Sequence, residues 1–372
     1  MLLISHKNCL SGFVMRNQRK LIAASRYVQG RGAIALLGEN VRKLGKRAYI
    51  IGGSTALSIT EERIRASLDA SGVDIAAIDN EVKDCTYATI DELVDKGKRT
   101  EPDFVIGVGG GRAVDTAKAV AWKLGVPAVS VGTQCATNAD GSAEFVVYTD
   151  DHKFLDAVIL PDNPAVVIVD TDVIASAPVK YLIWGMGDAL TAKFEAEAHA
   201  EAMRRKNAMV PTNTALALAN ATFESLMRYG FEAVEALKRG EHTDAVDEVI
   251  EAVKLSSAIA FENTGCALAH ALHNGLTQTG KMKAEHGEIV AYGTIVQATY
   301  EGRPEDEIRA IIEWCDGVGL PTKLAAICDH DGEALRRAVE YACGEDANAE
   351  SMPEKPDPTK VLKAIGRIEE GF

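Results

Sequence analysis

The sequence predicts a Rossmann-like α/β domain followed by an all-helical domain. Between about residues 31 and 172, short β-rich runs alternate with helical stretches, an order typical of a parallel sheet covered by helices. After Pro178 the strand-like runs nearly cease, and Ala, Glu, Leu and Lys dominate. We therefore expect an α/β domain over residues 15–175 and a helical domain over residues 176–372. A cleft between two unlike domains is where a ligand site is most often found.

Each expected element rests on a local pattern. Fully buried strands are short, continuous apolar runs, and four segments fit this description: residues 48–51, 104–108, 128–131 and 166–169. In the second half, helical patterns are clearest in four segments: residues 188–206, 212–229, 245–272 and 305–318. A proline-interrupted connection over residues 351–358 precedes a last short helix.

Composition excludes several functions. The chain has 372 residues, of which 47% are hydrophobic and 25% charged, the proportions of a soluble globular protein. Its formal net charge of −14 disfavours nucleic-acid and membrane binding, because phosphate backbones and anionic lipids repel an acidic surface. No apolar stretch approaches the roughly 20 residues that a membrane span needs. We expect a small-molecule substrate.

The cysteines and the N-terminal residues bear on cellular location. Seven cysteines are scattered without a CxxC pair, which favours reduced thiols and the cytoplasm. The first residues lack the continuous apolar region of a secretory signal. We interpret Met15 as a candidate native start and residues 1–14 as a non-native or disordered extension.

A glycine-rich turn follows the predicted strand 104–108. Gly109, Gly110 and Gly111 allow close approach of the main chain to a ligand, and the helix that begins there offers unpaired N–H groups and a positive dipole end. The motif is neither GxGxxG nor GxxxxGK[ST]. Its position after a strand indicates a diphosphate cradle, although a plain strand-to-helix turn has the same composition.

A second turn, containing Gly53 and Ser54, follows the predicted strand 48–51. In dinucleotide sites, an acidic residue near such a strand end binds the ribose hydroxyls and repels a 2′-phosphate. No acid stands at this turn. The turn therefore leaves room for NADP as well as NAD, and a turn without any ligand is the alternative.

Candidate metal ligands occur in the helical half. Asp188 is expected at the start of a helix, His270 and His273 near the end of another, and His286 beyond it. One carboxylate and two imidazoles with an open fourth position form a catalytic Zn²⁺ site, and the same set suits Fe²⁺. Taken singly, Asp188 is a suitable helix N-cap, and a histidine on an Ala/Leu face is usually a core side chain. Helical spacing does not choose between His270 and His273.

The order and spacing of these motifs resemble the glycerol dehydrogenase branch of the iron-containing (group III) alcohol dehydrogenases. The matching segments cover most of residues 27–300 and are residues 27–30, 44–46, 107–120, 163–164, 169–171, 185–190, 269–275, 286–288 and 290–297. The resemblance implies a dehydroquinate synthase-like architecture and an NAD-dependent oxidoreductase acting on CH–OH groups. It also implies a homo-oligomer, commonly an octamer.

The resemblance also assigns residues. It implies that Asp188, His270 and His286 bind the metal, which is usually Zn²⁺ in glycerol dehydrogenases. His273 then contacts a metal ligand or the substrate. The positions implied at the dinucleotide are Gly109, Gly110, Gly111, Asp115, Thr133, Ser142 and Tyr148.

Three positions depart from the family pattern. Arg112 replaces a lysine after the glycines and keeps a positive charge near phosphate. Gly53 replaces the ribose-binding aspartate, which weakens the preference for NAD over NADP. Asn138 replaces an aspartate that faces the polyol, and Asp140 stands two positions on, as in the related glycerol-1-phosphate dehydrogenases. Loss of a carboxylate makes an anionic substrate more acceptable.

The expected reaction is oxidation of a small alcohol or vicinal polyol. A bound cation would lower the pKa of the substrate hydroxyl, and a hydride would pass to the nicotinamide of NAD(P)⁺. One alternative is a glycerol-1-phosphate dehydrogenase or a hydroxy-acid oxidoreductase of the same superfamily, with Lys153 and Lys281 as candidate basic residues. More distant alternatives are a dehydroquinate synthase-like lyase, whose first metal ligand is usually Glu, and a non-catalytic nucleotide-binding protein.

Overall fold

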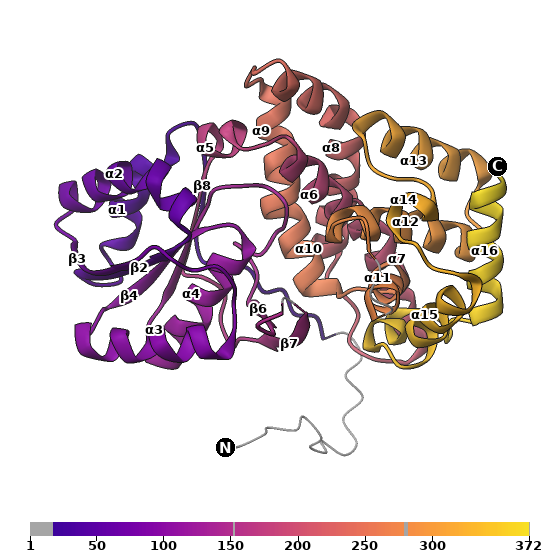
Figure 1. Ribbon diagram of the computed structural model, residues 1–372, viewed down its shortest axis with the longest axis horizontal. Helices are drawn as coiled ribbons and strands as arrows, with labels where there is room; N and C mark the ends of the chain where they lie inside the picture. The colour runs from indigo at the N-terminus through magenta and orange to yellow at the C-terminus, as the bar shows by residue number, and fades with distance from the viewer. Residues whose placement is uncertain (1–17, 152, 279–281, 372) are drawn as a thin grey trace.

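The computed structural model describes residues 18–151, 153–278 and 282–371. Met15, the segment 1–14 and Lys281 lie outside these residues. An α/β part and a helical part lie side by side (Figure 1). Within the described ranges, no helix is both long and apolar enough to cross a membrane.

The α/β part contains a six-stranded parallel sheet. Its spatial order is β1-β8-β5-β4-β2-β3, with β1 (Tyr27–Gly30), β8 (Val166–Asp170), β5 (Ala128–Gly132), β4 (Phe104–Gly109), β2 (Arg47–Gly52) and β3 (Asp74–Asp79). The four predicted strands are confirmed as β2, β4, β5 and β8. The two edge strands β1 and β3 were not predicted, because they are only partly buried and lack a continuous apolar run.

Helices cover both faces of the sheet. On one face lie η1 (Ala33–Leu36), α1 (Leu37–Val41) and α2 (Ser54–Ala70), and on the other lie α3 (Tyr87–Thr100) and α4 (Gly111–Leu124). Successive strand residues point to opposite faces, so Ile50 and Ile106 join the first core whereas Tyr49 and Val105 join the second. This double coverage explains why the central strands consist of uninterrupted apolar residues.

An antiparallel hairpin stands beside the main sheet. It consists of β6 (Glu144–Tyr148) and β7 (Phe154–Ile159), and β6 contacts α4. Neither strand was predicted, since β6 alternates between buried and half-buried positions and β7 is largely exposed.

The rest of the chain is helical, as expected. Its elements are α5 (Thr171–Ser176), α6 (Lys180–Leu190), α7 (Ala192–Arg205), α8 (Asn213–Lys238), α9 (Asp244–Glu251), η2 (Ala252–Ser256), α10 (Ser257–Thr264), α11 (Leu268–Gln278), α12 (His286–Glu301), α13 (Glu305–Val318), α14 (Leu324–Ile327), α15 (Gly332–Gly344), η3 (Ala347–Ser351) and α16 (Pro358–Glu370). Helix α13 has the predicted bounds, and α8 continues beyond the predicted 212–229.

Two segments that were each predicted as one continuous helix are divided in the structure. The segment 188–206 divides between α6 and α7. The segment 245–272 contains the π-helical turn η2 and then ends α10 at Gly265, whose positive φ of 73° interrupts the helix before α11 begins. Apolar periodicity continues through these breaks, so it could not locate them.

The strand order has its switch point at the carboxyl ends of β2 and β4. From β2 the chain moves to β3 on one side, and it then crosses to β4 on the other side and continues to β5 and β8. Ligands of open α/β sheets bind where the strand order reverses in this way. Gly52 pairs with Val108, and Gly109 with Gly132, so the turns after β2, β4 and β5 are neighbours.

Candidate active site

Asp188, His270 and His286 converge from three helices. Asp188 Oδ1 lies 3.4 Å from His270 Nε2 and 3.5 Å from His286 Nε2, and the three donor atoms all lie within 4.8 Å of one another. Asp188 is in the last turn of α6, so its prediction at the start of a helix, and with it the N-cap interpretation, is wrong. His270 is in the first turn of α11 rather than near a helix end, and His286 is the first residue of α12.

Close packing of α6 on α12 sets this spacing. A Cβ atom on Gly187 would overlap the carbonyl oxygen of Gly287, and one on Gly287 would overlap that of Trp184. The two glycines therefore let the helix backbones approach closely, one residue before Asp188 and one residue after His286. Side chains larger than hydrogen at either position would separate the carboxylate from the imidazole.

Glu195 of α7 orients His270. Its Oε2 accepts a hydrogen bond from His270 Nδ1 at 2.7 Å, and its Oε1 accepts from the backbone N–H groups of Ala267 and His270. The Glu195 side chain is 3% exposed. With Nδ1 engaged by Glu195, Nε2 is the ring nitrogen of His270 that faces Asp188 and is available to a metal ion. The Sγ atom of Cys266 lies within 4.8 Å of ligand atoms of Glu195 and His270. Burial raises the pKa of this thiol to about 12, so it is not an ionised ligand at physiological pH.

His273 contacts His286 and is not one of the three clustered donors. Its Nε2 lies 3.0 Å from His286 Nδ1, and its Nδ1 lies 2.9 Å from Asn274 Oδ1. Burial lowers the pKa of His273 to about 3. His273 is therefore neutral at physiological pH.

The cluster fits a divalent cation. Zn²⁺ lies about 2.0–2.2 Å from nitrogen and oxygen ligands, so tetrahedral ligand atoms stand roughly 3.4 Å apart. Burial acts to raise the pKa of Asp188, but its contacts with His270 and His286 outweigh that effect, and the net pKa is well below the usual range. The donor set consists of an ionised carboxylate and two correctly oriented imidazoles. These three protein ligands would leave the fourth coordination position of a tetrahedral cation open to a substrate.

The three glycines form the start of α4. Gly109 has a φ of 150°, a conformation that favours glycine, and Gly110 and Gly111 stand at the N-cap and first position of the helix. A Cβ atom on Gly110 would overlap the side chain of Gln134. The turn thus presents helix N–H groups at the carboxyl end of β4, which is the geometry of an anion cradle.

Other predicted dinucleotide positions surround this turn. Thr133 follows β5 and donates its backbone N–H to Gly109 O, while Tyr148 ends β6 and is half-buried. Burial raises the pKa of Tyr148 to about 12, so its phenol is protonated. Ser142 is buried, and its hydroxyl lies 3.4 Å from Ala139 O. Arg112 is largely exposed and forms an ion pair with Asp84.

Asp115 occupies an interior position. It forms an ion pair with the buried Lys118 at 2.8 Å and accepts a hydrogen bond from the backbone N–H of Val146 in β6. Lys118 Nζ also donates to Ala139 O. In this structure these contacts tie the hairpin and the loop after β5 to α4.

Gly53 and Ser54 begin α2 beside a small cavity. The cavity is lined by Ser54, Glu81, Val82 and Lys83. A Cβ atom on Gly53 would meet Val82 O at 3.6 Å, an ordinary contact, so steric exclusion does not require glycine here. The missing side chain leaves space next to a hydroxyl and an ammonium group, both suited to a phosphate.

The loop after β5 joins the two parts of the molecule. Asn138 Nδ2 donates to Ser257 Oγ of α10. Asp140 and Lys254 form an ion pair, and both side chains are 1% exposed. Lys254 belongs to the π-helical turn η2 and also donates to Thr137 O at 2.8 Å. Asp140 therefore forms a buried ion pair between the loop and η2 and is not exposed to a substrate.

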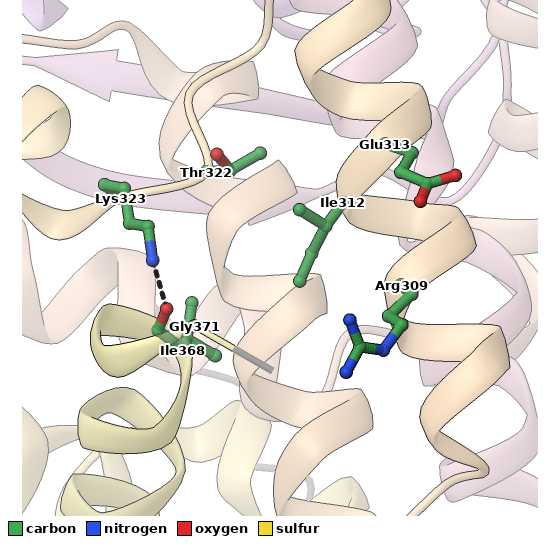
Figure 2. A pocket seen from close by; sticks show the side chains of 7 residues that line it. All are labelled: Arg309, Ile312, Glu313, Thr322, Lys323, Ile368 and Gly371. Atoms are coloured by element: carbon green, nitrogen blue, oxygen red, sulfur yellow. Dashed lines mark hydrogen bonds between the residues drawn. The ribbon is translucent and has the colours of Figure 1, made fainter.

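A pocket near the C terminus is separate from this site. Figure 2 shows its lining from α13, α16 and the chain before α14: Arg309, Ile312, Glu313, Thr322, Lys323, Ile368 and Gly371. Lys323 donates to the carbonyl of Ile368, and Arg309 pairs with Glu305, so its basic groups already have partners.

Comparisons with known proteins show the family to which this chain belongs. Residues 24–171 match the family model for iron-containing alcohol dehydrogenases. A glycerol dehydrogenase of Thermotoga maritima is 38% identical over 92% of this chain and 95% of its own length. The chain belongs to the glycerol dehydrogenase branch of the iron-containing alcohol dehydrogenase family.

Further relatives of this branch extend the comparison. A glycolaldehyde reductase of Halobacterium salinarum is 34% identical over 92% of this chain and 94% of its own. The crystal structure of a probable glycerol dehydrogenase from Sinorhizobium meliloti superposes with a TM-score of 0.85 at 33% identity, covering 95% of this chain and 98% of that one. The predicted family and fold class are confirmed.

Three residues of the site were not predicted from sequence. Glu195 reaches His270 through a tertiary contact, Asn274 contacts its sequence neighbour His273, and Asp346 contacts Asn274 from 72 positions away. The one local signal was an acid at the buried position 195 of an alanine-rich helix, since acids are almost never fully buried unless paired. Asn274 and Asp346 carry no such signal, because the hydrogen bond between them depends on how two segments 72 positions apart pack together.

Proposed function

We propose that this chain is a metal-dependent polyol dehydrogenase that transfers a hydride from a small vicinal hydroxyl compound to NAD(P)⁺. The observation that carries the proposal is the cluster of Asp188, His270 and His286. Asp188 Oδ1 lies 3.4 Å from His270 Nε2 and 3.5 Å from His286 Nε2. Family membership supports the same reaction class. The switch point of the strand order, with its glycine turn, supplies the second component, a nucleotide site.

Asp188, His270 and His286 would hold the cation, Zn²⁺ or Fe²⁺. When bound, the ion supplies Lewis acidity toward a substrate hydroxyl. Asp188 contributes the negative charge of the donor set, and Glu195 keeps the Nε2 lone pair of His270 directed toward the cluster. The chain's own contribution is thus a fixed, partly buried arrangement of ligands.

The dinucleotide would lie across the turns after β2 and β4. Gly109, Gly110 and Gly111 would bind the diphosphate through N–H groups of α4. At the other end, position 53 itself carries no carboxylate to oppose a 2′-phosphate, and the adjacent cavity is lined by Ser54 and Lys83 together with Glu81. These features support use of NADP as well as NAD.

The charges near the site favour a neutral polyol over a phosphate ester. Lys118 and Lys254, the buried cations beside the Asn138 loop, form ion pairs with Asp115 and Asp140. Lys153 pairs with Asp151 in the turn of the hairpin.

A homo-oligomer is part of the proposal. Strand β7 exposes Phe154, Leu155 and Ile159, the last with 81% of its surface accessible, and a second copy would cover this apolar area. A cytoplasmic location is proposed from the cysteine distribution. Light scattering coupled to gel filtration gives the assembly state directly, and a monomer would contradict this part.

Substrate and cofactor panels test the reaction. Protein stripped of metal and reloaded with Zn²⁺ or Fe²⁺ is mixed with glycerol, 1,2-propanediol, hydroxy acids or glycerol phosphate, each with NAD⁺ or NADP⁺. We expect cofactor reduction with the diols, dependent on the metal. Reduction only with glycerol phosphate or a hydroxy acid would overturn the substrate class, and no reduction with any pair would favour a nucleotide-binding protein without catalysis.

A further inference from the structure

We propose that Asp346, Asn274 and His273 form a directional hydrogen-bond chain that fixes the tautomer of His286. The chain would keep a proton on His286 Nδ1 and a lone pair on Nε2, the atom that faces Asp188. This inference rests on the proposed metal centre, and it adds three positioning residues to it. Each step follows from which atoms can donate and which can only accept.

The outer end of the chain is Asp346, which is buried and precedes η3. Its Oδ1 accepts a hydrogen bond from the backbone N–H of Asn348 at 2.9 Å, and its Oδ2 lies 2.8 Å from Asn274 Nδ2. A carboxylate only accepts hydrogen bonds, so Asn274 must turn its NH₂ group toward Asp346. The amide oxygen of Asn274 then points the other way.

The next step passes through His273. Asn274 Oδ1 lies 2.9 Å from His273 Nδ1, and a carbonyl oxygen only accepts, so the proton of His273 is on Nδ1. A neutral imidazole carries one N–H, which leaves a lone pair on Nε2.

The last step reaches His286. His273 Nε2 accepts across 3.0 Å from His286 Nδ1, which therefore carries the proton. The Nε2 atom of His286 is left with its lone pair, 3.5 Å from Asp188 Oδ1. Which nitrogen of a histidine binds metal is set by the hydrogen bond that the other nitrogen makes.

Exposure explains why His286 needs such a chain. The side chain of His286 is 44% exposed, against 15% for His270, and the latter is held directly by the buried carboxylate of Glu195. Water at an exposed imidazole satisfies either tautomer. A series of hydrogen bonds between partly buried groups, ending on a carboxylate, favours one tautomer of His286 over the other.

Two variants test the direction of the hydrogen bonds between Asp346 and His286. Asn274→Leu removes both hydrogen bonds of the amide. Asp346→Asn keeps the size of the side chain but places an NH₂ group among donors, so that Asn274 is driven to reverse its amide. We expect both variants to move the His286 proton toward Nε2 and to weaken Zn²⁺ binding by about tenfold or more.

Histidine ring nitrogens report the tautomer without any metal. Solid-state ¹⁵N NMR is recorded on metal-free protein labelled at its eight histidines, with the His286 signals identified by their loss in His286→Gln. Zn²⁺ affinity is measured separately by competition with a chelator. Asp357→Asn is the matched control, because Asp357 caps α16 as Asp346 precedes η3 but does not contact a histidine among its hydrogen bonds to Thr359 and Lys360.

The outcomes separate the two proposals. A His286 proton on Nδ1 in the parent protein that shifts in Asn274→Leu and Asp346→Asn, but not in Asp357→Asn, supports the chain. A proton on Nε2 in the parent protein, or unchanged spectra and affinity in both variants, overturns it. Loss of folding in Asn274→Leu leaves Asp346→Asn as the deciding variant. If the parent protein binds neither Zn²⁺ nor Fe²⁺, the metal centre itself is wrong.

Discussion

At the residue scale, the contact between Glu195 and His270 controls how the imidazole is presented. Glu195 accepts three hydrogen bonds, from one imidazole N–H and two backbone N–H groups, so both of its oxygens face donors. A glutamine cannot replace it, because its NH₂ group would face another donor.

We therefore expect Glu195→Gln to weaken Zn²⁺ binding by about 10- to 100-fold, the usual effect of losing a partner of a metal ligand. Chelator competition measures the affinity. Glu201→Gln on the same helix is the control, because Glu201 pairs only with exposed arginines. Equal affinity in both variants would show that Glu195 does not orient the ligand.

Gly53 makes a second prediction at this scale. A side chain fits there, so Gly53→Asp should fold and should repel a 2′-phosphate while accepting hydrogen bonds from ribose hydroxyls. Hydrogen bonds to charged groups are worth about 1.5–3 kcal/mol. We expect the ratio of kcat/KM for NAD⁺ over NADP⁺ to rise at least about tenfold. Gly53→Asn controls for size, and a similar rise in that variant would exclude charge as the cause.

At the element scale, the approach of α6 to α12 decides the distance between Asp188 and His286. The added methyl of Gly187→Ala would overlap the main chain of α12. Overpacking of this kind costs about 1–3 kcal/mol. We expect a lower free energy of unfolding together with weaker metal binding, measured by denaturant titration and chelator competition.

A glycine of another helix supplies the control. Gly366 lies in α16, and a Cβ atom there has no neighbour within 4 Å, so Gly366→Ala should leave metal binding unchanged and should not destabilise the fold. Normal metal affinity in Gly187→Ala would mean that α12 adjusts without moving His286.

The pairing of η2 with the loop after β5 gives another prediction at the element scale. Lys254→Met leaves Asp140 buried without its partner, and breaking such a pair costs about 3–5 kcal/mol. The double variant Lys254→Met with Asp140→Asn removes both charges and should recover part of the loss. Denaturant unfolding of the single and double variants measures the coupling, and strictly additive effects would contradict it.

At the scale of the whole molecule, metal binding should stabilise the fold, because its ligands come from three helices that unfolding separates. A ligand that binds only the native state contributes about 2.7 kcal/mol when its free concentration is about 100-fold above Kd. We expect chelation to lower Tm and added Zn²⁺ to restore it. Asp188→Asn should lose this response, and a metal-independent Tm in the parent protein would oppose the proposed centre.

Local patterns predicted much of this architecture. Central strands β2, β4, β5 and β8 were predictable because burial on both faces requires continuous apolar runs. The edge strands and the hairpin were not, since their partial exposure removes that signal. The break at Gly265 and the π turn at Lys254 were missed because helical periodicity continues across them.

For this protein, the sequence by itself determined the fold class, the glycine turn after β4 and the residue types of the metal cluster. These depend on local composition and order along the chain. Only the tertiary structure decided that Asp188 lies in the last turn of a helix, that His273 faces His286, that Glu195 holds His270, and that Asp346 contacts Asn274. The physical reason is that a hydrogen bond between residues more than 70 positions apart depends on helix packing, which no local pattern encodes.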